Sequence, residues 1–271
     1  MTRLLDLLRN PADLLLPAFV FLFFVFIIAP IAIVVWMAFS AQAYIGFPIP
    51  AYSLKWFYRI VEYEPFLNSL IVSIELAIAS TIVAATIGVP AALALARSRA
   101  GFADGLATFL LSPISMPQIV LGFALLFYLS ALGFGVSFTA LLLGHTLCGI
   151  PYIVRTVLGV YRSQPADFEE AAAILGANRW QVFRYVTLPL VRPGIFAGGL
   201  FALLISMDNL PISFFFGSPD TNTLPVVLLS YTENQFDPSI AAVSTVQMLL
   251  ALLALVVVDR VYGVKHMGAP S

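Results

Sequence analysis

Long apolar segments separated by polar connections are the main pattern along this chain of 271 residues. A helix that crosses a bilayer needs about 20 consecutive apolar residues, and six segments of the chain reach that length. The pattern predicts an all-α membrane protein with six transmembrane helices in one domain, residues 1–271. The expected spans are about 14–39, 67–96, 106–131, 137–160, 194–217 and 239–261.

The first apolar segment has two interpretations, because Arg3 and Arg9 precede it and Ala41-Gln42-Ala43 is similar to a signal-peptidase site. Signal-peptide cores run about 7 to 15 residues, whereas this segment is apolar from Leu14 to Phe39. We therefore expect an uncleaved membrane helix.

Composition supports a lipid environment, since 61% of the residues are hydrophobic and 10% are charged. Ordinary soluble domains carry about 25% charged residues, and lipid accepts apolar surface as its solvent. The net charge of −1 supplies no basic excess for binding phosphates, which argues against a nucleic-acid partner. Cys148 is the single cysteine, so no disulfide framework can form within the chain.

The basic residues predict the orientation. With six spans, all but two of the 13 Lys and Arg residues lie on the side of the termini, the exceptions being Lys55 and Arg59. Basic residues stay in the cytoplasm during insertion, so we expect both termini there. The outer 41–66 segment contains Trp56, Phe57 and Tyr58, which favour a short amphipathic helix at the interface.

The cytoplasmic connection 161–193 is longer than a tight helix–helix turn requires. Asp167 followed by Glu170, and Asn178 followed by Gln181, each fit a capping box that starts a helix. Gly176 lies between them and can end the first helix in the left-handed conformation. The sequence predicts two short helices joined at this glycine.

The same loop ends at Leu188-Pro189 and Pro193, which we expect to mark the return into the membrane. Helices this short are marginal in water without a surface to pack against. Either a partner protein supplies that surface, or the loop folds back on the inner ends of its own spans. Small and apolar side chains suited to a groove are Ala171, Ala172, Ala173, Ile174, Leu175, Trp180 and Phe183.

Glu170-Ala171-Ala172, then Gly176, then Leu188-Pro189 resembles the EAA loop of permease subunits of bacterial ATP-binding-cassette (ABC) importers. The resemblance implies the type I ABC importer permease (MetI-like) fold, with the loop forming a coupling helix that docks on a cytoplasmic ATPase. The residues expected in that coupling role are Asp167, Glu169, Glu170, Ala171, Ala172, Leu175, Gly176, Ala177 and Trp180.

Further stretches are similar to the second permease of spermidine and putrescine importers. They are Asn68-Ser69-Leu70, Gly144-His145-Thr146, Ser206-Met207-Asp208-Asn209 and Thr223-Leu224-Pro225. Polyamine permeases usually have two adjacent acids where this chain has Asp208-Asn209, so the second position departs from their pattern. The resemblance implies a small organic solute, expected to be a cation such as a polyamine.

Ionisable groups inside a span are costly and mark a pathway or a pairing. Glu75 lies about 12 Å below the outer start of its span at the helical rise per residue, and Asp208 lies at a similar depth in the fifth span. Pro211 interrupts that span just after Asp208-Asn209, and broken backbone at membrane depth is tolerated beside a cavity. We hypothesise that Asp208, Asn209 and Glu75 line the solute path. Interhelical hydrogen bonding by protonated carboxyls is the alternative.

His145 and Cys148 are spaced for one helix face, but two ligands do not make a metal site, and packing is the better interpretation. Gly194 and Gly198 form a Gly-x-x-x-Gly pattern that allows close helix approach. The pattern fits an internal contact and a seam with a second permease subunit equally well.

No Gly-x-x-x-x-Gly-Lys-Ser/Thr phosphate loop is present, since neither Lys55 nor Lys265 follows the required glycine. We expect no enzyme activity and no cofactor on this chain, with ATP and Mg²⁺ on the partner ATPase. The alternative is a secondary transporter or channel that acts without an ATPase, which leaves the loop's apolar side chains without a role.

The resemblance also implies the assembly: a second homologous permease in a heterodimer, two cytoplasmic ATPase subunits and an extracytoplasmic solute-binding protein. The expected location is the bacterial inner membrane, with membrane lipid around a multi-pass chain.

Overall fold

The computed structural model describes residues 11–98, 101–165, 167–219 and 221–262, and regular structure within these ranges is helical apart from one bridge pair, Ser40 and Tyr52. The chain divides into two compact units. One comprises Met1–Tyr63 with Thr232–Leu249, and the other comprises Glu64–Tyr231 with Leu250–Ser271.

The first unit contains α2 (Pro11–Ala38), α3 (Lys55–Glu62) and the first part of α13 (Ser239–Tyr262). None of the residues in the most apolar stretch of α2 is buried within the chain. These side chains must therefore contact lipid or another protein. Helix α3 is amphipathic as expected, because Trp56 and Ile60 are buried one turn apart. The Trp56 indole donates a 2.8 Å hydrogen bond to the carbonyl of Ser40.

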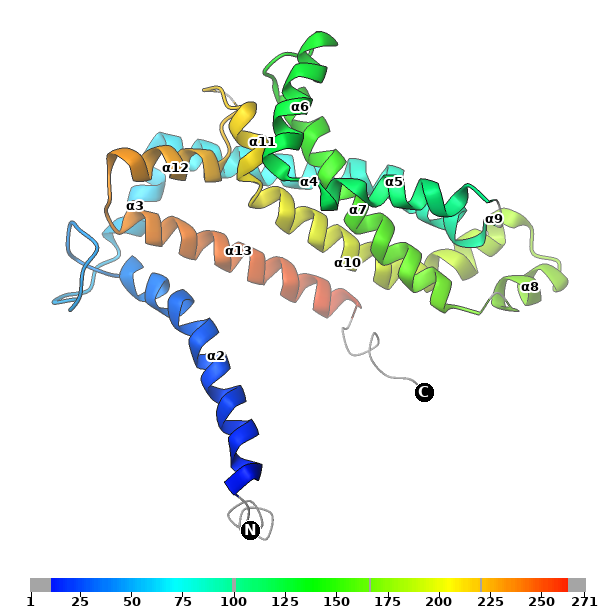
Figure 1. Cartoon of the computed structure of the whole chain (residues 1–271), viewed down its shortest axis with the longest axis horizontal. Coiled ribbons are helices and arrows are strands. Elements are labelled where there is room, and N and C mark those ends of the chain that lie inside the picture. The colour runs from blue at the N-terminus through cyan, green and yellow to red at the C-terminus, as the bar shows by residue number, and fades with distance from the viewer. Residues whose placement is uncertain (1–10, 99–100, 166, 220, 263–271) are drawn as a thin grey trace. The chain divides into compact units, whose positions relative to one another are not determined.

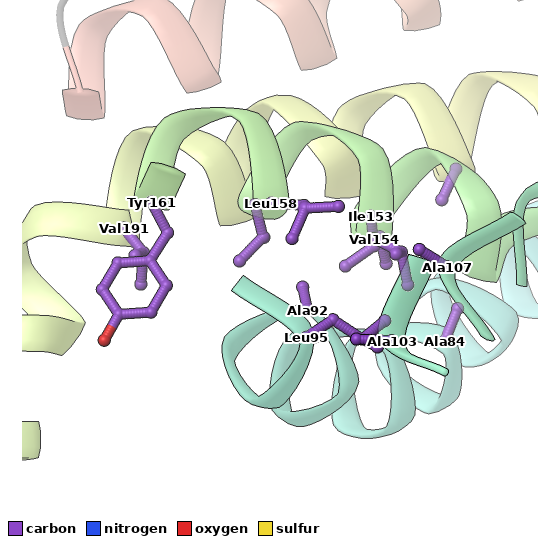
Figure 2. Close-up of a cluster of buried hydrophobic side chains, with 12 residues drawn as sticks. Ala84, Ala92, Leu95, Ala103, Ala107, Ile153, Val154, Leu158, Tyr161 and Val191 are labelled. Carbon is purple, nitrogen blue, oxygen red and sulfur yellow. The ribbon is translucent and has the colours of Figure 1, made fainter. Parts of the chain in front are cut away.

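The second unit is built around α4 (Glu64–Arg97), α7 (Phe138–Ser163) and α10 (Leu188–Met207), which run alongside one another (Figure 1). A buried hydrophobic cluster joins them to α5 (Ala103–Ser115), as Figure 2 shows. The cluster includes Ala84, Ala92, Leu95, Ala103, Ala107, Ile153, Val154, Leu158, Tyr161 and Val191.

Small residues let these helices approach closely, as is common where helices pack in membranes. A Cβ on Gly88 would lie 3.1 Å from Ile153 Cγ2, and one on Gly149 would lie 3.3 Å from the Cβ atoms of both Ala84 and Ala202. The side of α4 that contacts α7 and α10 must therefore stay small.

The Gly194/Gly198 pattern is an internal contact in the structure. A Cβ on Gly198 would lie 2.8 Å from the Cα of Ile153, and one on Gly194 would lie 3.1 Å from the Cα of Val157. The Thr156 hydroxyl also donates a 2.9 Å hydrogen bond to the Gly194 carbonyl. These glycines form the seam between α10 and α7.

The third predicted span, 106–131, is not one straight helix. It consists of α5 and α6 (Gln118–Ala131), which are bent by 105° at the intervening Met116-Pro117. Met116 is extended, with φ −84° and ψ 141°, because a residue that precedes proline disfavours the helical region. Among the described residues, five single helices are long and apolar enough to cross a membrane, and this bent pair can provide a sixth span.

The fifth predicted span is interrupted as expected at Asp208-Asn209, where α10 ends and α11 (Leu210–Phe215) begins. Its inner end differs from the prediction, because Leu188-Pro189 does not break the helix. A π-helical turn, η1 (Phe183–Thr187), runs directly into α10, and Pro189 occupies the first turn of α10. Pro189 has no N–H to donate, and the helix tolerates it because the π-helical turn just before it already interrupts the i→i−4 hydrogen-bond pattern.

The connection between α11 and α13 contains the helix α12 (Leu224–Asn234). The Leu224 N–H donates a 2.8 Å hydrogen bond to the Ser73 hydroxyl of α4. This contact fastens the start of α12 to the second span.

Candidate functional site

The 161–193 loop forms two short helices, α8 (Asp167–Ile174) and α9 (Arg179–Val182), joined at Gly176. Gly176 has φ +87°, the left-handed conformation that glycine tolerates best. Its N–H bonds the Ala173 carbonyl at 3.0 Å, and the Ala177 N–H bonds the Ala172 carbonyl at 3.1 Å. These two bonds form a Schellman motif that ends α8, as the sequence predicted for this glycine.

The second capping box is confirmed. The Gln181 N–H donates to the Asn178 side chain at 2.9 Å, and the Asn178 N–H donates to the Gln181 side chain at 2.8 Å. The first box is wrong in its register, because Asp167 is already the first helical residue and not the cap. Asp167, Glu169 and Glu170 instead place negative charge in the first turn of α8, where it stabilises the helix dipole.

Large apolar side chains of the loop are exposed to solvent. Ile174 is 85% exposed, Leu175 is 88% exposed and Trp180 is 65% exposed. Beside them is a hollow of about 340 Å³ lined by Ala172, Leu175, Gly176, Ala177, Gln181, Tyr185 and Val186. Adjoining exposed apolar groups around a hollow mark an interaction surface. We call α8, the Gly176 turn and α9 the loop surface.

Glu169, although it lies in α8, contacts the neighbouring helices. Its carboxylate accepts hydrogen bonds from the hydroxyls of Tyr161 at 2.6 Å and Thr187 at 2.7 Å. Arg97 Nε lies 3.7 Å from the other carboxylate oxygen, and its guanidinium lies over the Tyr161 ring at 4.4 Å from the centroid. One side chain of α8 thus contacts α7, η1 and α4, whereas its neighbour Glu170 is exposed.

A second polar region lies where the two broken helices meet. The Asn209 side chain caps α11 by accepting a 3.1 Å bond from the Ile212 N–H. Its amide donates a 3.2 Å bond to the side-chain oxygen of Gln118, the first residue of α6 after the bend. The two breaks in the membrane segments are therefore joined to each other.

His145 of α7 bridges the two helices on either side of the Asp208-Asn209 break. Its Nδ1 lies 2.8 Å from the Ser206 hydroxyl in α10, and its Nε2 lies 3.0 Å from the Ser213 hydroxyl in α11. The Ser80 hydroxyl of α4 donates to Ser206 at 3.2 Å. His145 is 1% exposed, which agrees with the packing role expected from the sequence. It also makes hydrogen bonds through both ring nitrogens.

Asp208 and Glu75, two of the three predicted path residues, are both exposed in the second unit, while Asn209 is buried. Glu75 lies on a different face of α4 from the buried Ser73, Leu76 and Ser80. Within the described part of the chain, no hydrogen bond joins Glu75 to Asp208 or Asn209. The structure brings Asn209 together with Gln118 and Ser213, which the sequence analysis did not single out, and with Ser206, which it named only for family resemblance. A polar residue, Gln118, directly after Pro117 inside an apolar segment was the sequence feature that could have indicated this contact.

Metal chemistry gains no support from the described residues, among which no group of three or more His, Cys, Asp or Glu side chains is placed to hold an ion.

The long apolar helices and the broken span define a multi-pass membrane protein. A family model described as "Binding-protein-dependent transport system inner membrane component" matches residues 87–264. The match covers more than half of the chain, so the chain belongs to this family and is the permease subunit of a binding-protein-dependent ABC importer.

Curated relatives include two transport systems with different named solutes. The chain is 34% identical over 239 residues to the molybdenum transport system permease protein ModB of Mycobacterium tuberculosis, with 81% of this chain and 89% of that protein covered. It is 28% identical over 249 residues to the spermidine/putrescine transport system permease protein PotC of Haemophilus influenzae, with 92% and 96% covered.

Solved structures share the fold. A chain of a bacterial ABC transporter involved in the import of the acidic polysaccharide alginate superimposes with a TM-score of 0.70 at 17% identity, covering 93% of this chain and 98% of that one. A chain of the MetNI methionine ABC transporter in an inward facing conformation gives a TM-score of 0.58 at 20% identity, covering 73% and 96%.

Proposed function

We propose that the loop surface docks on a cytoplasmic ATPase and that this contact drives solute movement through the second unit. The observation that carries the proposal is the exposure of Ile174, Leu175 and Trp180 on a loop whose backbone is fixed by a capping box and a Schellman motif. Exposed aromatic and aliphatic side chains on a rigid support are typical anchors of a protein interface. Glu170, Ala171 and Ala177 belong to the same surface.

Glu169 has a different role in this proposal from the docking role that the family resemblance implied. Its carboxylate contacts Tyr161, Thr187 and Arg97, so a displacement of α8 is passed to three neighbouring elements. A continuous helix also runs from Arg179 to Met207, and it ends next to Asp208. A motion imposed on the loop surface thereby reaches the break in the membrane.

The solute path is proposed to include Asp208, Asn209 and Glu75, and to favour a cation. Supporting this, Asp208 is exposed at a helix break, and residues 208–231 contain two acidic side chains and no Lys or Arg. A region of one charge sign raises the local concentration of the opposite ion. The spermidine and putrescine relatives agree with a polyamine. The 34% identity to a molybdenum permease favours a second candidate, a molybdenum-containing solute.

The proposed assembly contains a second permease subunit, giving a heterodimer, two ATPase subunits that bind ATP and Mg²⁺, and an extracytoplasmic binding protein. We place both termini of this chain in the cytoplasm on the distribution of Lys and Arg. The structure describes neither terminus.

Uptake by the assembled transporter tests the solute proposal. Labelled putrescine and labelled molybdate are each offered to cells with the parent chain, with Asp208→Asn and with Glu233→Gln, an exposed outer acid that serves as the control. We expect putrescine uptake that falls about tenfold in Asp208→Asn, the size of losing one charged contact, and persists in Glu233→Gln. Uptake of molybdate alone, or unchanged putrescine uptake in Asp208→Asn, would contradict the cation path.

Dependence on the partner ATPase tests the docking proposal separately. We expect the ATPase to co-purify with the parent chain and to be lost from a variant carrying Leu175→Glu. Uptake that continues without the ATPase would instead support the secondary transporter or channel.

A further inference from the structure

The exposed carboxylate of Asp208 sits on a short piece of chain that buried hydrogen bonds hold on both sides. Ser206, two residues earlier, contacts His145, and Ser213, five residues later, contacts the other nitrogen of the same imidazole. Asn209 is held by Gln118. The break between α10 and α11 is thus fixed at three points around Asp208.

The chemistry of histidine suits this bridge. A neutral imidazole offers one donor and one acceptor nitrogen, so it can satisfy two hydroxyls that lie in different helices. Whichever ring nitrogen carries the proton donates to one serine hydroxyl, and the other nitrogen accepts from the other serine. Every polar group in this chain of bonds then has a partner, as buried groups require.

Close packing removes other ways of arranging α11. A Cβ on Gly122 of α6 would lie 3.0 Å from the Pro211 carbonyl oxygen, and one on Gly144 of α7 would lie 3.0 Å from Ile212 Cγ2. Helix α11 is therefore held between α6 and α7. Packing on two sides limits the rotation of α11 about its axis, and the hydrogen bonds of Asn209 and Ser213 select one orientation.

We propose that His145 and Gln118 are positioning residues for Asp208, because together they fix the broken backbone that presents its carboxylate. This inference rests on the proposed function, in which Asp208 faces the solute. His145 acts through Ser206 and Ser213, whereas Gln118 acts through Asn209 and links the bend of α5 and α6 to the same point. Neither residue contacts the solute in this proposal.

Thiol accessibility measures the presentation of position 208 directly. Cys148 is the single cysteine, so a chain with Cys148→Ala and Asp208→Cys carries one thiol. In the full transporter complex, the rate of its modification by a cationic methanethiosulfonate reagent is compared among the His145 parent, His145→Phe, Ser213→Ala and Thr146→Val. Thr146 is the matched control, since it is buried beside His145 and its hydroxyl has no hydrogen-bond partner among the described residues.

We expect His145→Phe and Ser213→Ala to change the modification rate by about tenfold, the consequence of losing a buried hydrogen bond at the break. Thr146→Val is expected to leave the rate unchanged. Equal rates in all four backgrounds would overturn the proposal. Ser213→Ala decides the outcome if His145→Phe prevents assembly, because the smaller change removes one bond and keeps the imidazole.

A transport measurement separates positioning from simple stability. With Asp208 restored, a positioning role predicts that Ser213→Ala raises the KM for putrescine while the amount of assembled complex and its ATPase activity stay at the parent level. Less assembled complex with an unchanged KM would show a structural role alone. If Asp208→Asn has no effect on transport but the thiol rates still change, the solute path fails and the positioning of residue 208 stands.

Discussion

Tyr161 donates a 2.6 Å hydrogen bond to the carboxylate of Glu169, so the first turn of α8 is fastened to the last turn of α7. Two adjacent glutamates of the loop therefore have different surroundings. Glu169 is shared among the helices behind it, and Glu170 is exposed on the loop surface.

Glu169→Gln and Glu170→Gln are expected to separate force transmission from docking. Glu169→Gln keeps the shape of the side chain but removes the charge that Tyr161, Thr187 and Arg97 contact, so ATP hydrolysis should continue while less solute moves per ATP. Glu170→Gln should instead weaken co-purification of the ATPase. Solute uptake and phosphate release, measured on the same proteoliposomes, give the ratio of solute transported to ATP hydrolysed. An unchanged ratio in Glu169→Gln would refute its role in transmission.

Gly176→Ala is expected to distort the turn that orients the two loop helices. A side chain at φ +87° costs about 1–2 kcal/mol, and the strain is relieved if the Schellman turn opens. Co-purification of the ATPase should fall. Gly159→Ala provides the control, because Gly159 lies in α7 and a Cβ added there would meet no atom within 4 Å. Equal ATPase binding by the two variants would argue against a rigid turn.

Trp180→Ala is expected to weaken the ATPase contact without destabilising the subunit. Trp180 is 65% exposed, so its truncation creates no internal cavity, while aromatic anchors often dominate an interface. Phe236→Ala removes a similarly exposed ring, 67% exposed, from the predicted outer side and should have no effect. Thermal unfolding of the purified subunit and pull-down of the ATPase provide the two measurements. A lowered unfolding temperature in Trp180→Ala would show that the loop packs on its own chain.

Gly198→Ala and Gly199→Ala form a matched pair that tests the seam between α10 and α7. A methyl on Gly198 would lie 2.8 Å from the Ile153 Cα, whereas one on Gly199 meets only Thr81 Cγ2 at 3.7 Å. Overpacking of this kind costs about 1–3 kcal/mol, so Gly198→Ala should lower the unfolding temperature in detergent. Gly199→Ala should unfold like the parent. Similar temperatures for both variants would contradict the tight contact.

Local signals in the sequence were enough for most of the helices and for the loop. Apolar length marked the segments that become α2, α4, α7 and α13, because burial in lipid depends on composition and not on a particular neighbour. The Gly176 turn and the Asn178 capping box could be predicted equally well from the sequence, since each is made by residues a few positions apart. The break after Asp208 followed from Pro211 in the same way.

Only the tertiary structure decided which polar groups meet. These contacts join residues up to 91 positions apart. They are the contacts of Glu169 with the helices behind it, the bonds of His145 to Ser206 and Ser213, and the bond from Asn209 to Gln118. Such pairings depend on how the helices pack, and each polar residue alone fits either a solvated face or a buried contact. The Gly194/Gly198 pattern carried the same ambiguity until packing against Ile153 assigned it to the interior. Sequence thus determined the helices and the loop that we propose as the coupling surface, while packing determined how that loop and the membrane breaks are held.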